Sequence, residues 1–102
     1  MPWHEAATLS DIPTGKIGKT IINNQKIAIY NVDGTIYATE NRCSHQEVEL
    51  SNGILHNCQI ECPWHGAQFD LKTGQVKALP AALPIKTYPT KVENGKIFIE
   101  ME

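Results

Sequence analysis

Short apolar segments broken by turn residues run along most of the chain, with no convincing amphipathic helix among them. The segments whose composition favours strands are 3–7, 16–22, 25–32, 35–39, 85–92 and 96–101. Three of the intervening dipeptides, Asn23-Asn24, Asp33-Gly34 and Asn94-Gly95, tolerate positive φ angles and are typical of two-residue hairpin turns. The pattern therefore predicts strands that follow one another in antiparallel hairpins.

The middle of the chain has fewer long apolar segments than either end. Its predicted elements are a turn at 51–53, short strands at 59–61 and 67–71, and a turn at 72–74. We expect this part, about residues 40–78, to form a small β subdomain inserted into a larger antiparallel β sandwich or barrel. The predicted fold class is all-β.

Composition narrows the function classes. A chain of 102 residues, 41% hydrophobic and 20% charged, is ordinary for one globular domain, which we expect to span residues 1–102. No apolar stretch has the length of a membrane span, and the N-terminal residues lack the charged and apolar regions of a secretory leader. The net charge is −2 and the basic residues are scattered. We therefore expect a cytoplasmic protein that binds neither membranes nor nucleic acid.

Four residues of the middle region form two Cys–His pairs, Cys43 with His45 and Cys62 with His65. Each pair offers one sulfur and one nitrogen, and a Rieske-type [2Fe–2S] cluster needs such a set, because two histidines replace two cysteines on one of its irons. We predict that the cysteines hold one iron as thiolates and that the histidines hold the other. Zinc also accepts two cysteines and two histidines, but the single residue between Cys43 and His45 is tighter than zinc-finger spacing.

The motif Cys-x-His at 43–45 is followed by Cys-Pro-x-His-Gly-x-x-Phe-Asp at 62–70. Ile-Tyr-Ala-Thr precedes it at 36–39, and Thr-Gly at 73–74 and a proline-bearing loop at 80–84 follow it. In these features the chain resembles, over nearly its whole length, the Rieske ferredoxins that serve bacterial aromatic-ring oxygenases. The resemblance implies an all-β fold that carries one [2Fe–2S] cluster at its tip, between two loops.

The same resemblance implies a one-electron carrier and not an enzyme. Its partners would be an NAD(P)H-dependent flavoprotein reductase, which supplies the electrons, and the terminal oxygenase of an aromatic-ring-hydroxylating dioxygenase, which receives them. We expect docking through the tip. The residues expected there are His45, Pro63, Trp64, His65, Pro80 and Pro84.

No hydroxyl group is expected to donate to the cluster sulfurs. The Rieske proteins of respiratory complexes have a serine and a tyrosine after the second pair, and the matching residues here are Ala67 and Phe69. Those proteins also have a disulfide between the loops, where this chain has Val48 and Trp64. Hydrogen bonds to the sulfurs stabilise the reduced, anionic site, so their absence predicts a potential near the low end of the Rieske range, roughly −150 mV.

Two other systems share features with this sequence. Gln46-Glu47 after the first histidine is similar to ferredoxins of toluene monooxygenase-type systems. Small Rieske-like subunits of assimilatory nitrite reductase have a similar size but often lack cluster ligands, whereas this chain has all four.

The remaining cysteine and the first tryptophan have structural interpretations. We expect Cys58 to be a reduced cysteine on a strand, outside the ligand set. We expect Trp3 to be a core residue.

Overall fold

The computed structural model of the chain describes residues 2–43, 48–63, 66–78 and 83–101. Its elements in chain order are β1 (Trp3–Thr8), η1 (Leu9–Asp11), β2 (Ile17–Ile22), β3 (Gln25–Val32), β4 (Thr35–Glu40), η2 (Leu50–Asn52), β5 (Ile54–His56), β6 (Gln59–Glu61), β7 (Gln68–Asp70), β8 (Val76–Ala78), β9 (Thr87–Tyr88), β10 (Thr90–Glu93) and β11 (Lys96–Glu100). The two η elements are single 3₁₀ turns. No helix within these described ranges is long and apolar enough to cross a membrane.

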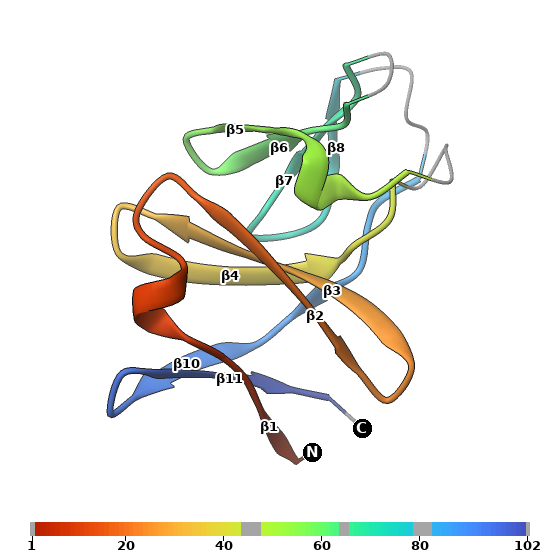
Figure 1. The fold of residues 1–102 in the computed structure, drawn as a ribbon. Coiled ribbons are helices and arrows are strands. Elements are labelled where there is room, and N and C mark those ends of the chain that lie inside the picture. The colour runs from red at the N-terminus through yellow and green to blue at the C-terminus, as the bar shows by residue number, and fades with distance from the viewer. Residues whose placement is uncertain (1, 44–47, 64–65, 79–82, 102) are drawn as a thin grey trace.

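The strands form three antiparallel sheets, with the orders β1-β11-β10, β2-β3-β4-β9 and β5-β6-β7-β8. Figure 1 shows the β5–β8 sheet at one end of the molecule and the β1-β11-β10 sheet at the other, with both termini beside the latter. The strands β2, β3 and β4 lie between these two ends. The predicted all-β, antiparallel fold is confirmed.

Strand β3 is covered on both faces and supports the whole arrangement. Ile27 and Ile29 pack in one apolar cluster with Ile97 of β11. Ala28 and Tyr30, which alternate with them along the strand, belong to a second cluster with residues of β6 and β7. Successive side chains of a strand point to opposite faces, so one strand contributes to both clusters. This double burial explains why residues 27–30 form a continuous apolar run and do not alternate with polar residues.

The predicted hairpin turns are confirmed. Both residues of Asn23-Asn24, of Asp33-Gly34 and of Asn94-Gly95 have positive φ angles, between 51° and 90°. Two consecutive residues with positive φ define the type I′ geometry, whose twist matches that of the flanking strands. These local sequences therefore set the register of β2 with β3, of β3 with β4 and of β10 with β11.

The prediction of one strand at 85–92 is wrong. The chain instead forms β9, which pairs with β4, and β10, which pairs with β11 in a different sheet. Pro89 separates the two strands. Because proline has no N–H group, it cannot continue a ladder as a donor, and its carbonyl instead accepts the N–H of Glu100 at 3.0 Å.

Further details differ from the sequence expectations. Trp3 is not a core residue: it is 38% exposed on β1, and the Lys91 ammonium lies 4.6 Å from its ring centroid. The outer face of the three-stranded sheet thus gains a cation–π contact in place of a buried indole. Strands β5 and β8, which pair with β6 and β7, are missing from the predicted elements.

Gly74 fixes the approach of residues 83–85 to the turn before β8. It has φ +80°, and a Cβ there would collide with the carbonyl oxygen of Ile85. The N–H of Ile85 donates to the carbonyl of Gly74 at 2.8 Å. Glycine is therefore required here for two reasons, the left-handed backbone and the close approach of a second segment.

We predict that Gly74→Ala lowers stability more than Gly15→Ala does. Gly15 has nearly the same φ, +81°, but no atom lies within 4 Å of its virtual Cβ. In the control, the free energy of unfolding should therefore fall only by the cost of placing alanine in the left-handed conformation, about 1–2 kcal/mol. In Gly74→Ala the collision with Ile85 lowers it further. Thermal unfolding followed by circular dichroism at one scan rate compares the two midpoints. Equal midpoints would mean that the Ile85 carbonyl can move away from the added methyl group without a loss of stability.

Candidate metal centre

Cys43 lies at the base of the first predicted ligand loop. It follows β4, is fully buried, and donates its N–H to the carbonyl of Val48 at 3.0 Å. This hydrogen bond closes a loop from one residue to the residue five positions ahead. Because the cysteine is inside the closed base, its thiol starts from a fixed point in the core.

Cys62 has the same position in the second loop. It follows β6, is 1% exposed, and donates its N–H to the carbonyl of Ala67, again five residues ahead, at 2.6 Å. The loop is a continuation of the β6–β7 ladder, in which Glu61 pairs with Gln68. Gly66 has φ +73°, which glycine adopts without strain.

Both cysteines belong to one apolar cluster, which also contains Leu50, Ile60 and Phe69. The fold thus brings the sulfur half of the predicted ligand set into a single buried region. His45 and His65 lie outside the described residues, as do Trp64 and Pro80. Among the residues that are described, no group of three or more His, Cys, Asp or Glu side chains is placed to hold a metal ion. The complete ligand set therefore stays a prediction.

Two buried hydroxyl groups, that of Tyr30 in this cluster and that of Thr39, are already engaged. The hydroxyls of Tyr30 and Thr39 lie 2.8 Å apart, and the Thr39 hydroxyl donates to the carbonyl of Glu40 at 2.8 Å. The Tyr30 hydroxyl must therefore donate to Thr39, and burial raises the pKa of Tyr30. Ala67 and Phe69 are fully buried and have no hydroxyl, as the sequence indicates.

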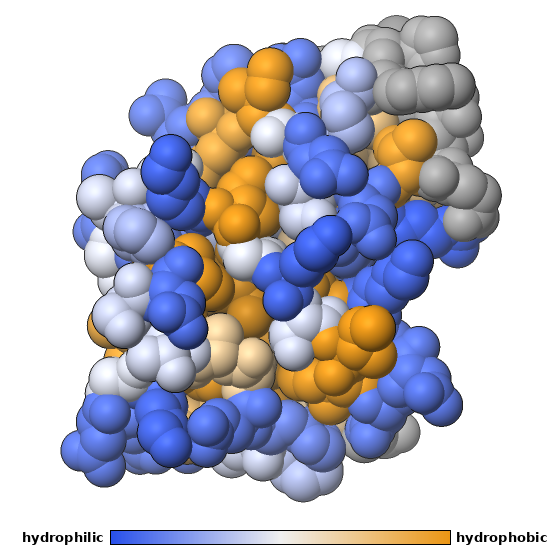
Figure 2. Space-filling view, in the orientation of Figure 1, coloured by the Kyte–Doolittle hydropathy of each residue, from blue (hydrophilic) through white to orange (hydrophobic). Residues whose placement is uncertain are grey.

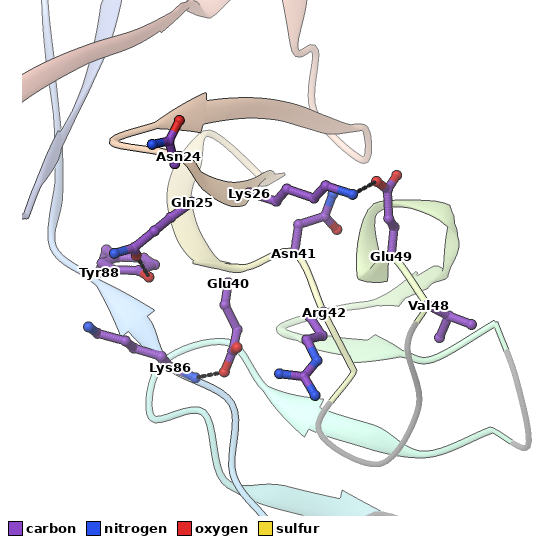
Figure 3. A pocket seen from close by; sticks show the side chains of 10 residues that line it. All are labelled: Asn24, Gln25, Lys26, Glu40, Asn41, Arg42, Val48, Glu49, Lys86 and Tyr88. Atoms are coloured by element: carbon purple, nitrogen blue, oxygen red, sulfur yellow. Dashed lines mark hydrogen bonds and ion pairs between the residues drawn. The ribbon is translucent and has the colours of Figure 1, made fainter.

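A groove of about 430 Å³ lies beside the base of the first loop (Figure 3). Glu49, which follows Val48, accepts from the ammonium groups of Lys19 at 3.2 Å and Lys26 at 3.4 Å. The hydrogen bond from Lys19 is the main reason why the pKa of Glu49 lies below its ordinary value. The ten residues that line the groove include no serine, cysteine or histidine.

Cys58 has a different environment from the other two cysteines. It lies in the turn between β5 and β6 and not on a strand, and it is half-buried. A hydrogen bond with Cys58 is the main cause that raises the pKa of Tyr37, and the charges of Cys58 and Asp70 act in the same direction. The thiol of Cys58 therefore has a hydrogen-bond partner, the hydroxyl of Tyr37.

The predicted tip is described only in part. Pro63 and Pro84 are both exposed. Leu83, which sequence reasoning missed, is 64% exposed next to Pro84. Figure 2 shows other apolar patches between polar residues on the face it presents. Large exposed apolar side chains elsewhere come from separate strands: Trp3, Ile21, Ile54 and Val92.

A family model, related sequences and solved structures all indicate the same protein family. The model of the Rieske [2Fe–2S] domain matches residues 2–89. The chain is 44% identical over 100 residues to the ferredoxin component of the naphthalene 1,2-dioxygenase/salicylate 5-hydroxylase systems of Ralstonia sp, a match that covers 98% of this chain and 96% of that protein.

Solved structures agree with the sequence relatives. The ferredoxin of carbazole 1,9a-dioxygenase from Nocardioides aromaticivorans IC177 superposes with a TM-score of 0.94 and 30% identity, and all of both chains is covered. A ferredoxin chain in a complex of reduced oxygenase and oxidised ferredoxin in carbazole 1,9a-dioxygenase gives a TM-score of 0.88 and 30% identity, with 98% of this chain and 97% of that chain covered.

The donor set fits the cluster that the family implies. Thiolates are the ligands that iron–sulfur clusters prefer, and two buried cysteines at the bases of separate loops supply them. The apolar residues of this cluster surround both cysteines, an environment that would limit the access of water to a cluster bound there.

We predict that Cys58→Ala lowers the pKa of Tyr37 toward its ordinary value near 10, because the hydrogen bond and the electrostatic contribution of Cys58 are both lost. Cys58→Ser keeps a hydrogen-bonding group and should retain part of the shift. Ultraviolet titration of the tyrosines would show an earlier phenolate transition in the alanine variant. An unchanged titration would mean that Cys58 does not contact Tyr37.

Proposed function

The chain belongs to the Rieske [2Fe–2S] family, and we propose that it is the ferredoxin of an aromatic-ring-hydroxylating dioxygenase system. It takes single electrons from an NAD(P)H-dependent flavoprotein reductase and delivers them to the terminal oxygenase. It is an electron-transfer component and not the hydroxylating catalyst, and the relatives named as ferredoxin components support this. It acts in the cytoplasm, where NAD(P)H is available.

The observation that carries this proposal is the matched pair of buried cysteines. Each donates its N–H to the carbonyl five residues ahead, and both lie in one apolar cluster. In the proposed site Cys43 and Cys62 ligate one iron of a single [2Fe–2S] cluster, and His45 and His65 ligate the other. When bound, such a cluster accepts and releases one electron.

The proposed organisation is one Rieske domain, in which about residues 40–78 form the subdomain that binds the cluster. The sheet β5–β8, at one end of the molecule, supplies most of this part (Figure 1). A centre at an end of the molecule can come close to that of a partner, which electron transfer requires.

Docking on the oxygenase uses the tip. The exposed Pro63, Leu83 and Pro84 provide apolar contact area there, and His45, Trp64, His65 and Pro80 complete the proposed surface. The solved complex of oxygenase and ferredoxin supports a terminal oxygenase as the partner class.

A second candidate is the ferredoxin of a toluene monooxygenase-type system, which the Gln46-Glu47 sequence favours. Reconstitution separates the two. Purified reductase and dioxygenase components of a naphthalene-type system should form product from NAD(P)H only when this protein is added. A carrier of the monooxygenase type would support the corresponding monooxygenase instead.

We predict that Cys43→Ser and His65→Ala abolish the Rieske spectrum, because each removes an iron ligand, whereas Cys58→Ser leaves it nearly intact. Anaerobic purification, reduction with dithionite and electron paramagnetic resonance measure this directly. A colourless, zinc-containing wild-type protein would refute the proposed cluster. Loss of the signal in Cys58→Ser would refute the ligand assignment.

We predict that Ala67→Ser raises the midpoint potential. A hydroxyl that donates to a cluster sulfur stabilises the anionic reduced site more than the neutral oxidised site. Since hydrogen bonds to charged groups exceed neutral ones by about 0.5–2 kcal/mol, the expected increase is roughly 20–90 mV for a one-electron couple. Ala67→Val, which adds bulk without a donor, is the control. Equal potentials in the two variants would contradict the absence of a donor as the cause of a low potential.

A further inference from the structure

Each ligand loop is closed by a hydrogen bond of the same kind, from the cysteine N–H to the carbonyl five residues ahead. The backbone that flanks this bond differs between the two loops. Under the Cys62–Ala67 bond the β6–β7 ladder begins at once, with Glu61 opposite Gln68. Under the Cys43–Val48 bond there is no ladder, because residues 41–43 and 48–49 belong to no strand. The first loop therefore needs another device to hold its two ends together.

The side chain of Asn41 provides this device. Its Nδ2 donates to the Oγ of Ser51 at 3.0 Å, and its Oδ1 accepts the backbone N–H of Ser51 at 2.7 Å. Its own N–H donates to the carbonyl of Lys26 at 2.9 Å. Figure 3 shows Asn41 beside Lys26 and Glu49, at the groove under the first loop. The side-chain amide of Asn41 thus joins the residues before Cys43 to the 3₁₀ turn η2, and its backbone N–H joins them to the hairpin β2–β3.

The turn held by Asn41 also contacts β6, the strand that leads into the second loop. Gly53, which ends η2, lies so close to β6 that a Cβ there would collide with the carbonyl oxygen of Glu61. Glu61 directly precedes Cys62. A displacement of Ser51 would therefore shift both cysteines. It would reach Cys43 through Asn41, two residues before it, and Cys62 through the contact of Gly53 with Glu61.

We propose that Asn41 is a positioning residue for the metal centre, which sets the geometry of the first ligand loop relative to the second. The inference rests on the proposed function, since it assigns a role toward the proposed cluster. Asn41 is only 3% exposed, so water cannot replace the hydrogen bonds that its amide makes. Groups that hydrogen-bond directly to metal ligands change metal affinity about 10–100-fold when they are removed. Asn41 acts through the backbone that precedes Cys43, so we expect an effect at the lower end of this range.

Asn31 is a matched control for Asn41. It is also a buried asparagine, 6% exposed, with two side-chain hydrogen bonds: Nδ2 donates to the carbonyl of Ile12 at 2.8 Å, and Oδ1 accepts the N–H of Gly34 at 2.9 Å. It contacts neither ligand loop through these bonds. If Asn41 only stabilises the fold, Asn41→Ala and Asn31→Ala should have similar g-values, midpoint potentials and rates of iron release, because each substitution removes a buried amide with two hydrogen bonds.

The experiment compares cluster-loaded wild type, Asn41→Ala, Asn31→Ala, Ser51→Ala and Ser51→Thr. We expect both asparagine variants to unfold at lower temperature. Only Asn41→Ala and Ser51→Ala should shift the electron paramagnetic resonance g-values and the midpoint potential. We expect Asn41→Ala to release iron to a chelator about 10-fold faster than Asn31→Ala. Ser51→Thr keeps the hydroxyl and should restore the wild-type spectrum.

The possible results separate the two levels of inference. A wild type without a Rieske spectrum refutes the proposed function, and the role of Asn41 with it. With a normal wild type, g-values, potential and iron release in Asn41→Ala equal to those in Asn31→Ala refute the positioning role. If neither asparagine variant retains a cluster, the serine pair decides: a shift in Ser51→Ala that Ser51→Thr reverses supports the proposal, and identical spectra in both overturn it.

Discussion

The hydrogen bonds from the N–H groups of Cys43 and Cys62 to the carbonyls five residues ahead are the constraint on which the site depends. Each closes a loop at its base and leaves the cysteine on the core side of the closure. The apolar cluster around the two thiols is in turn fixed by β3, whose Ala28 and Tyr30 pack against it. Since the other face of β3 packs in the second cluster, a change in either core is transmitted to the sulfur side of the site.

Local sequence was sufficient where local conformation decides the structure. Asn23-Asn24, Asp33-Gly34 and Asn94-Gly95 adopt positive φ through their own side-chain properties, so the hairpins could be predicted. Features that depend on contacts between distant segments could not be predicted in this way. The exposed position of Trp3 depends on Lys91, which is distant in sequence, and the change of sheet at Pro89 depends on two partner strands.

The candidate site divides in the same manner. The Cys–His motifs predict ligand identity, because their spacing is a local property of the chain, and the structure adds the common burial of the cysteines. The sequence did not single out Asn41, since a lone asparagine resembles any turn residue until Ser51 is seen opposite it. It also could not show that the hydroxyls of Tyr30 and Thr39 bind each other. In that pairing the Tyr30 hydroxyl donates to Thr39, and the Thr39 hydroxyl donates to the carbonyl of Glu40.

The exposed apolar residues near the site are held by the same core as the cysteines. Ile85 belongs to the cluster that contains Cys43 and Cys62, and its N–H is bound to Gly74 in the turn before β8. Leu83 and Pro84 directly precede Ile85, so their positions are tied to the sheet that carries Cys62. An exposed leucine costs hydration free energy in the isolated protein, and this cost is recovered when a partner covers it. A rigid attachment also reduces the entropy lost on docking. In the proposed carrier, both effects strengthen a contact with the oxygenase at Leu83 and Pro84.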